Sequence, residues 1–491
     1  MSEHTPMMRQ YLSIKKQYED TFLFFRLGDF YELFYDDAIK AARELEITLT
    51  QRDPGQKQPI PMCGVPHHSA ERYIKTLVDK GYKVAICEQV EDPEKAVGVV
   101  KREVVQVITP GTVMEQAMLD DQESNYISSL SYFPDQSFVL VYNELSTGET
   151  KILLMTSGWE AVLHELFNQS VKEIVIATSL PEQYVKDLQD RLKMTISYED
   201  DVTFNAEYRP LCENLTDERL LEAFSRLLNY IHRTQKRSLD HLQQAEIIEL
   251  NNYLTLDMYS KRNLELTETI IQKDRYGSLL WLLDQTNTAM GSRLLKQWIE
   301  RPLIDESSIE VRLNIVEVMF NQFIEREHLR EALKDVYDLE RLTGRVSFGN
   351  VNARDLRQLK KSLQKIPDIQ NCLQSMNDPS IDQLNEQLVF PKAIVDLLEK
   401  SIAEEPPISI TEGSIIKDGY DETLDQYRDA SRNGKKWIAE LEQQEKEITN
   451  IRSLKIKYNR VFGYFIEVTN PNLHLIPEGR YERKQTLTNS E

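Results

Sequence analysis

The sequence predicts a multidomain protein in which α/β domains precede a largely helical region. At 491 residues the chain is longer than a single hydrophobic core supports. Strand-like and helix-like apolar patterns alternate up to about residue 250, and helical periodicity predominates from residue 252 onward. A long periodic segment at 421–451 then leads into short alternating strands. We therefore expect a fold class of multidomain α/β plus α.

The first predicted domain covers residues 1–112 and is a small, mixed α/β domain. Thr5 is a suitable cap, and Pro6 a suitable first residue, for a helix over 5–18. Gly28-Asp29 is typical of a hairpin turn, and Thr109-Pro110-Gly111-Thr112 is typical of a linker. The other expected elements are strands at 21–27, 30–34, 47–50, 82–88 and 103–108, helices at 36–45 and 69–81, the latter capped by Ser69, and a turn-rich loop at 51–61 that carries Arg52.

Two side chains of the second hairpin strand are candidates for a function. Residues two apart on a strand share a face, so Phe30 and Glu32 are expected on one face, and Tyr31 and Leu33 on the other. The second face is apolar enough for a core. The first presents an aromatic ring beside a carboxylate at the tip of a hairpin. Periodicity alone also allows a plainer interpretation, in which Phe30 is a core aromatic and Glu32 a solvated charge.

A second α/β domain is predicted at residues 126–250. Residues 216–236 have a strongly amphipathic helical pattern. Nuclease chemistry is not expected, because it needs clustered carboxylates around metal ions and the sequence shows no convincing set. The remaining elements of this domain are strands at 137–141, 151–155 and 172–177, a turn at 146–149, and helices at 159–167 and 181–192.

Residues 251–420 are predicted to form a helical domain, followed by a long helix at 421–452 and an incomplete β module at 453–491. The long periodic segment would reach about 45 Å, and Gly434 interrupts it at a cost of roughly 1 kcal/mol. A lever that carries the β module and an ordinary coiled-coil arm differ little in sequence. The charged segments at 290–295, 338–342 and 352–356 are interpreted as amphipathic helices with exposed charged faces and a packing role.

Composition argues against several classes of protein. We expect no membrane span, no secretory signal and no metal site, and the four separated cysteines indicate reduced thiols. The sequence contains no Gly-x-x-x-x-Gly-Lys-Ser/Thr loop.

A net charge of −21 argues against nucleic-acid binding by the chain as a whole. However, residues 1–107 carry 15 basic and 17 acidic side chains, and residues 451–491 carry 7 and 4. The two ends therefore suit contact with phosphates, while the acidic middle favours solubility.

Three motifs resemble the mismatch-binding domain of the MutS family of DNA mismatch-repair proteins: Gly28-Asp29-Phe30-Tyr31-Glu32-Leu33-Phe34, Pro61-Met62-Cys63-Gly64-Val65-Pro66-His67-His68-Ser69 and Ala85-Ile86-Cys87-Glu88-Gln89. The similarity continues along the chain. It implies a ribonuclease-H-like connector at 126–250, a helical core, a lever helix and a β clamp. Asn143-Glu144-Leu145 and Thr449-Asn450-Ile451 depart from the family pattern, which usually has an Asp before the Ser-Thr-Gly-Glu element and Thr-Gly-Ile at the end of the lever.

The resemblance implies that Phe30 and Glu32 read mismatched or looped base pairs by minor-groove wedging and bending, which initiates DNA mismatch repair. It also implies contacts to the DNA backbone from Arg52, Lys455, Lys457, Asn459, Arg460, Arg483, Lys484, Gln485 and Thr486. No catalytic residue is expected in this chain. Two alternatives are a relative that binds DNA junctions, which would lack the Phe-x-Glu element, and a non-catalytic scaffold that docks other repair proteins.

Family resemblance also sets expectations about cofactors, partners and location. In the family an ATPase domain, with ATP and Mg²⁺, follows the clamp and forms most of the dimer interface. We therefore expect this chain to be an N-terminal portion that binds no cofactor and does not hydrolyse ATP. The implied partners are mismatched double-stranded DNA, a second copy of the intact protein and a MutL-type repair protein. The implied location is the bacterial cytoplasm, in association with the nucleoid.

Overall fold

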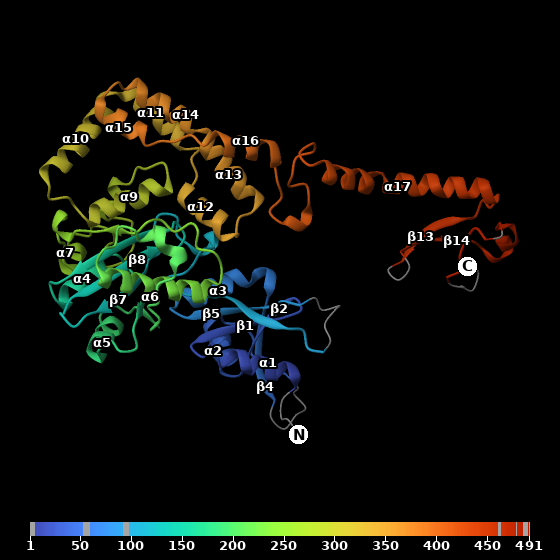
Figure 1. The fold of residues 1–491 in the computed structure, drawn as a ribbon, viewed down its shortest axis with the longest axis horizontal. Helices are drawn as coiled ribbons and strands as arrows, with labels where there is room; N and C mark the ends of the chain where they lie inside the picture. Colours follow the sequence, from blue (N-terminus) through green and yellow to red (C-terminus); the bar gives the residue numbers. More distant parts are fainter. Residues whose placement is uncertain are drawn as a thin grey trace. The chain divides into compact units, whose positions relative to one another are not determined.

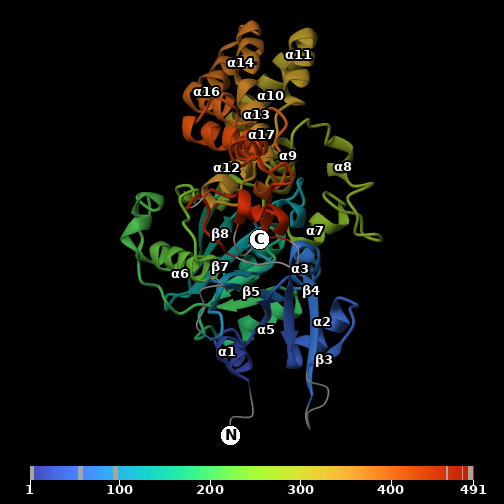
Figure 2. The same ribbon diagram turned by 90° about the vertical axis from the view of Figure 1, so that its right-hand side faces the viewer.

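The computed structural model describes residues 5–52, 59–91, 98–459, 463–477, 479–484 and 490. The chain folds into two units, residues 1–398 and residues 399–491. The first contains two mixed six-stranded sheets and a series of helices, and the second contains a long helix and a two-stranded sheet (Figures 1 and 2). The predicted fold class, multidomain α/β plus α, is confirmed.

The N-terminal sheet has the strand order β3-β4-β2-β1-β5-β6. Helices α2 and α3 contribute to the core on one face of this sheet, and α1 covers part of the other face. The elements are α1 (Pro6–Lys15), β1 (Thr21–Leu27), β2 (Phe30–Phe34), α2 (Tyr35–Glu44), β3 (Thr50–Arg52), β4 (Ile60–Pro66), α3 (Ala70–Asp79), β5 (Lys83–Gln89) and β6 (Arg102–Ile108).

Most of the predicted N-terminal elements are present, but strand β4 was not predicted, and the third strand, the position of Arg52 and the cap of α3 were predicted incorrectly. The third strand was predicted at 47–50 but begins at Thr50, because residues 45–47 form a turn at the end of α2 in which Glu46 has φ +56°. Arg52 accordingly lies within that strand and not in the following loop. Ser69 does not cap α3 with its side chain, since its hydroxyl donates to the Pro66 carbonyl at 3.2 Å. Part of the predicted loop at 51–61 lies outside the described residues.

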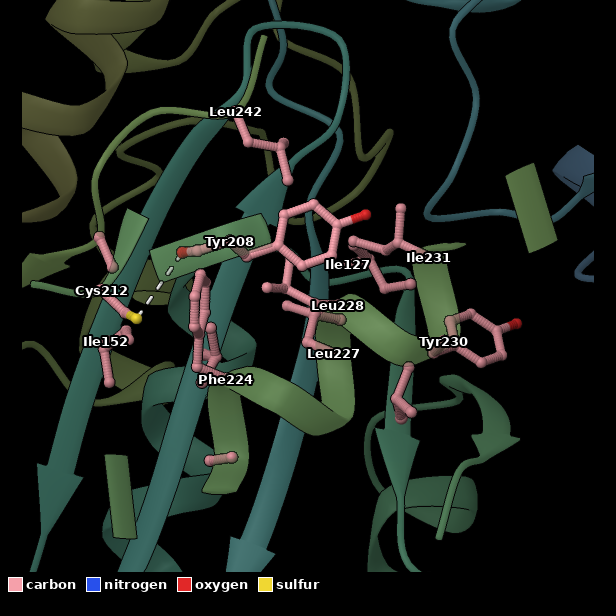
Figure 3. Packing of buried hydrophobic residues seen from close by; sticks show 14 of the residues in the cluster. Ile127, Ile152, Tyr208, Cys212, Phe224, Leu227, Leu228, Tyr230, Ile231 and Leu242 are labelled. Carbon is pink, nitrogen blue, oxygen red and sulfur yellow. Dashed lines mark hydrogen bonds between the residues drawn. The ribbon is translucent and has the colours of Figure 1, made fainter. Parts of the chain in front are cut away.

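The connector sheet has the strand order β11-β10-β7-β8-β9-β12. Helix α6 packs on one face, where Figure 3 shows Phe224, Leu227 and Leu228 over the strands, and α4 and α5 cover the other face. Strands β7 and β11 were not predicted individually. The elements are β7 (Ile127–Tyr132), β8 (Phe138–Glu144), β9 (Glu149–Met155), α4 (Trp159–Asn168), β10 (Glu173–Ile176), α5 (Glu182–Asp190), β11 (Thr195–Tyr198), α6 (Glu218–Gln235) and β12 (Glu246–Ile247).

The predicted linker at 109–112 is a tightly packed turn. Thr109 and Thr112 are fully buried. The buried carboxylate of Glu173 accepts hydrogen bonds from the Thr109 hydroxyl and, at 3.0 Å, from the Gly111 amide. A Cβ atom at Gly111 would lie 2.7 Å from the Cβ of Ile127, so only glycine fits here. The first sheet is therefore joined to the connector by a fixed turn.

The region from residue 251 is helical, as predicted, but several charged side chains that were predicted to be exposed are buried. Arg293, Arg341 and Arg345 are buried. Arg293 binds Asp338 at 2.6 Å, and Arg341 binds Glu144 of the connector at 3.1 Å, so these charges join elements instead of facing water. The helices are α7 (Met258–Asn263), α8 (Leu279–Leu283), α9 (Ala289–Glu300), α10 (Glu306–Asn321), α11 (Phe323–Leu333), α12 (Leu339–Phe348), α13 (Ala353–Gln364), α14 (Ile366–Ser375), α15 (Pro379–Glu386) and α16 (Lys392–Ser401).

The second unit is built on α17 (Glu422–Thr449), which Asp421 caps and which Gly434 does not break. Its strands β13 (Lys455–Asn459) and β14 (Gly463–Glu467) pair antiparallel over a small core of Ile451, Leu454 and Val468. Residues 480–484 were predicted as part of a β module but form no strand. Their chain turns back to α17, where Arg480 binds Glu445 at 2.8 Å.

Among the described residues, no helix is both long and apolar enough to cross a membrane.

Candidate nucleic-acid interface

The hairpin of β1 and β2 ends in a tight turn. Leu27 and Phe30 are paired across the strands, so Gly28 and Asp29 are the two central turn residues. Gly28 has φ +58°, as expected for glycine at the first position of a type II′ turn. Because the turn contains only two residues, Phe30 lies directly at the tip.

Burial decreases along one face of β2 toward this tip. Phe34 is fully buried, Glu32 is half-buried and Phe30 is 46% exposed. The gradient arises because α1 covers only the inner end of this face. Tyr11 of α1 contacts the Phe34 ring edge-on, with centroids 4.9 Å apart, and donates to the Phe34 carbonyl at 3.3 Å. Tyr31 and Leu33 are buried on the opposite face, as predicted.

Gly64 of β4 lies opposite Glu32 and provides space for the two candidate reading side chains. A Cβ atom at this position would lie 3.5 Å from Glu32 Cγ and 3.8 Å from Phe30 Cδ1. It would also lie 3.3 Å from the Tyr31 carbonyl oxygen, which is closer than most such contacts. A larger side chain would therefore compete for the space that Phe30 and Glu32 use.

Arg52 is the charged partner of Glu32 in this structure. Its guanidinium Nη1 donates to Glu32 Oε2 at 3.1 Å, and its Cζ lies 5.8 Å from the centre of the Phe34 ring. Burial raises the pKa of the Glu32 carboxyl above its ordinary value, and Arg52 acts in the opposite direction. The structure thus brings together Phe30, Glu32 and Arg52, three of the residues predicted from the sequence.

The second set of predicted contacts lies in the second unit. Lys455, Lys457 and Asn459 alternate along β13 and so share one face of the strand. Lys457 binds Glu467 at 2.6 Å, and Lys484 binds Glu482 at 2.8 Å. Arg483 lies beside Lys484 in the segment that forms no strand. Arg460, Gln485 and Thr486 lie outside the described residues.

Two tyrosines add exposed aromatic surface to the same strands. Tyr458 of β13 and Tyr464 of β14 are each 63% exposed, and their rings meet edge-on with centroids 5.1 Å apart. They alternate with the lysines of β13, and therefore lie on the other face of the small sheet. Sequence analysis did not single them out, because exposed and buried aromatics have the same strand pattern.

Chemistry at the hairpin tip is limited to stacking, hydrogen bonding and charge. Within the described part of the chain, no three His, Cys, Asp or Glu side chains are grouped so as to hold a metal ion. Cys63 and Cys87 of the N-terminal sheet are buried free thiols, and burial raises the pKa of Cys63 to about 11.

Sequence reasoning assigned no role to several residues around the tip: Arg26, Gly64, His67 and Glu88. Gly64, His67 and Glu88 belong to the motifs at 61–69 and 85–89. The signal was therefore present, but the motifs gave no indication that β4 and β5 lie on either side of the hairpin. That information is in the strand order.

Comparison with family models gives three consecutive matches. Residues 5–117 match MutS domain I, residues 125–243 match MutS domain II and residues 260–471 match MutS domain III.

Curated relatives are similar over the whole chain. A DNA mismatch repair protein MutS from Oceanobacillus iheyensis is 66% identical over 491 residues, which are 100% of this chain and 57% of the relative. Proteins of the same name from Geobacillus sp. (strain WCH70) and Bacillus cytotoxicus are 60% and 55% identical over 491 residues, which are 57% and 55% of those relatives. The chain thus spans a little over half the length of the relatives that it matches.

Proposed function

The chain belongs to the MutS family of DNA mismatch-repair proteins, and we propose that it recognises mismatched or looped base pairs in duplex DNA. Recognition occurs when Phe30 wedges into the base stack from the minor groove and the duplex bends. The observation that carries this proposal is the position of Phe30. It is 46% exposed at the tip of a two-residue turn, on a face whose inner residues are buried. A core aromatic would not be placed in this way.

The free-energy costs of unstacking and bending DNA explain how a wedge selects faulty base pairs. Unstacking one base step costs a few kcal/mol, and bending the duplex costs on the order of 1–6 kcal/mol. A mispaired step stacks and pairs poorly, so both costs are lower there. The backbone charge is the same in matched and mismatched DNA. Selectivity therefore comes from deformability, and the ring of Phe30 tests it.

Glu32 adds a hydrogen bond to a base that the wedge has displaced. Its ionised carboxylate accepts a hydrogen bond, and its protonated form can donate one. Burial already raises the pKa of this carboxyl, and nearby phosphates would raise it further. Arg52 binds Glu32 at 3.1 Å, and a phosphate of the bound DNA would compete with Glu32 for the Arg52 guanidinium. The charge state of Glu32 thus depends on which partner Arg52 has.

Backbone contacts supply the part of the affinity that does not depend on sequence. We assign these contacts to Lys455, Lys457 and Asn459 on β13, to Arg483 and Lys484, and to Arg460, Gln485 and Thr486. Lysine and arginine neutralise phosphates, so this part of the affinity falls steeply with salt. Lys457 and Lys484 must exchange Glu467 and Glu482 for phosphate oxygens, which lowers their net contribution.

This chain covers 57% of the relative from Oceanobacillus iheyensis, and the following proposals concern the whole protein. We propose that the intact protein pairs with a second copy of itself, acts with a MutL-type repair protein, and works in the bacterial cytoplasm at the nucleoid. ATP and Mg²⁺ would belong to a domain other than MutS domains I, II and III. The residues of this chain carry no phosphate-binding loop, so no ATP-dependent step enters the proposal.

A binding assay with matched and faulty duplexes tests the proposed function. Fluorescently labelled duplexes that differ only in one mismatched or one unpaired base would be titrated with the chain at fixed salt. We expect tighter binding to the faulty duplexes than to the fully matched one. Equal affinity for all three duplexes would contradict mismatch reading and would favour a scaffold role.

A further inference from the structure

We propose that Arg26, Tyr31 and Glu88 form a brace behind the hairpin tip, and that this brace positions Phe30 for mismatch discrimination. The inference rests on the proposed function, because the brace acts on DNA only through Phe30. These three residues lie on the face of the sheet opposite to Phe30 and Glu32, so they are positioning residues and do not themselves meet a base.

The brace joins three neighbouring strands. Arg26 of β1 and Tyr31 of β2 are directly paired, and the Arg26 guanidinium lies 5.5 Å from the centre of the Tyr31 ring. The Tyr31 hydroxyl donates to Glu88 Oε1 of β5, and Arg26 Nη1 lies 3.8 Å from the same oxygen. Each member thus contacts the other two, and Tyr31 is buried.

The turn itself is held from both sides. Arg26 Nε donates to the Gly28 carbonyl at 2.5 Å, so the brace reaches the first turn residue. The His67 amide of the neighbouring segment donates to the Asp29 carbonyl at 2.9 Å. Both central carbonyls of the turn therefore have fixed partners. These contacts restrict bending and twisting of the hairpin at the point where Phe30 is attached.

Rigidity at this position matters because a wedge must transmit force. Pairing between β1 and β5 ends at Phe25 and Cys87, two residues before the end of β1, and α1 does not cover this end of the sheet. If the tip could bend, pushing against a base step would displace the hairpin instead of the bases. The chain would then bind mismatched and matched base steps with similar affinity. The brace therefore raises discrimination without adding a contact to DNA.

The experiment compares Tyr31→Phe with a matched control, Tyr18→Phe. Tyr31→Phe keeps the ring and removes only the hydroxyl that binds Glu88. Tyr18→Phe likewise removes a hydrogen-bonded hydroxyl from the N-terminal domain, one that accepts from Lys236 at 2.9 Å, but leaves the brace intact. Two measurements are made on each chain: amide hydrogen exchange at residues 27–31 without DNA, and affinity for mismatched and matched duplexes over a range of salt concentrations.

We expect Tyr31→Phe to accelerate exchange at 27–31 and to lower the mismatch preference, each about tenfold, the size of one charge-assisted hydrogen bond. The salt dependence of binding to matched DNA should not change, because no phosphate contact is lost. Glu88→Gln, which keeps an acceptor and loses the charge, should give an intermediate effect. If Tyr31→Phe fails to fold, Glu88→Gln still allows both measurements to be made on a chain with a weakened brace.

Two results would overturn the brace. Unchanged exchange in both Tyr31→Phe and Glu88→Gln would show that the contacts do not stiffen the tip. Faster exchange with an unchanged mismatch preference would show that tip rigidity does not serve reading. A parent chain without any mismatch preference would instead remove the proposed function, and with it the role assigned to the brace.

Discussion

The hairpin tip and the strands β13 and β14 use their side chains in opposite ways. At the tip, one exposed ring extends from a sheet that is mostly buried, and the nearby charges of Arg26 and Arg52 are paired with Glu88 and Glu32. On β13 the lysines lie at the surface, and the described part of this unit has a small core of Ile451, Leu454 and Val468. The comparison shows how mismatch recognition and binding of the DNA backbone make different demands on a protein surface. Mismatch recognition needs a rigid shape whose charges are paired within the sheet, whereas backbone binding needs charges at the surface and tolerates a small core.

The largest expected effect comes from removing the ring at the tip. Phe30→Ala should abolish the preference for mismatched over matched duplexes, because it removes the exposed aromatic ring at the end of the hairpin. Stability should change little, since Phe30 is half exposed. Phe323→Ala is the matched control, because Phe323 is 62% exposed on α11. Competition binding measures both variants, and an equal preference in Phe30→Ala and in the parent would refute the role of the ring.

Glu32 should have a smaller effect on discrimination and a distinct dependence of stability on pH. Glu32→Ala should weaken the mismatch preference and leave salt-dependent binding to any duplex intact. Loss of all binding in this variant would indicate a folding role.

The pH dependence follows from the raised pKa of the Glu32 carboxyl. The folded chain holds this proton more tightly than the unfolded chain, so this group's contribution to stability falls as pH rises through the window above its ordinary value. Relative to the parent, Glu32→Gln should therefore gain stability as pH rises above 4.5, the ordinary pKa of this carboxyl. Glu103→Gln should show the opposite trend, because Lys101 lowers the pKa of Glu103. Urea denaturation at several pH values measures both, and parallel curves for Glu32→Gln and the parent would contradict the assignment.

Neutralising the basic strand region should change binding without changing discrimination. Replacing Lys457 and Lys484 with Gln should reduce the slope of log affinity against log salt by up to about 2, since each phosphate contact contributes roughly 0.9. The mismatch preference should remain. The double variant Lys417→Gln and Lys436→Gln removes the same charge from the same unit and should leave the slope unchanged. A slope that stays constant in the first variant would remove Lys457 and Lys484 from the interface.

The smallest expected effect concerns the end of α17. Asn450 has φ +56°, the left-handed conformation that glycine or asparagine adopts most readily at the end of a helix. Asn450→Gly should therefore change stability by less than about 0.5 kcal/mol, and Asn450→Val should lower it by about 1–2 kcal/mol. Asn433→Gly, inside the helix, should cost about 1 kcal/mol. Thermal melting measures all three, and equal stability of Asn450→Val and Asn450→Gly would contradict this account of the helix end.

Sequence patterns predicted those features that depend on local chemistry. Gly28-Asp29 predicted the hairpin, and alternation placed Phe30 and Glu32 on one face. The departure at Asn450 is explained by the structure, because asparagine tolerates the backbone conformation that glycine adopts there. Boundaries were less accurate where a helix end competes with a strand, as at residues 45–50.

Long-range pairing could not be predicted from the same patterns. Arg341 and Glu144 are 197 residues apart, and only the fold shows that they bind each other in the interior. A charged residue on a helix has the same pattern whether it faces water or a buried partner, so Arg293 and Arg341 were placed wrongly. The brace at Arg26, Tyr31 and Glu88 was missed for the same reason, because it depends on β5 lying beside β1.

The central claim is that one ring distinguishes faulty base pairs because they unstack more easily. The most direct measurement places a fluorescent base analogue beside a mismatch and beside a matched pair, and records its emission as the chain binds. The account predicts a rise in emission at the mismatch with the parent chain, a smaller rise at the matched pair, and none with Phe30→Ala. An equal rise with the parent and with Phe30→Ala would contradict it.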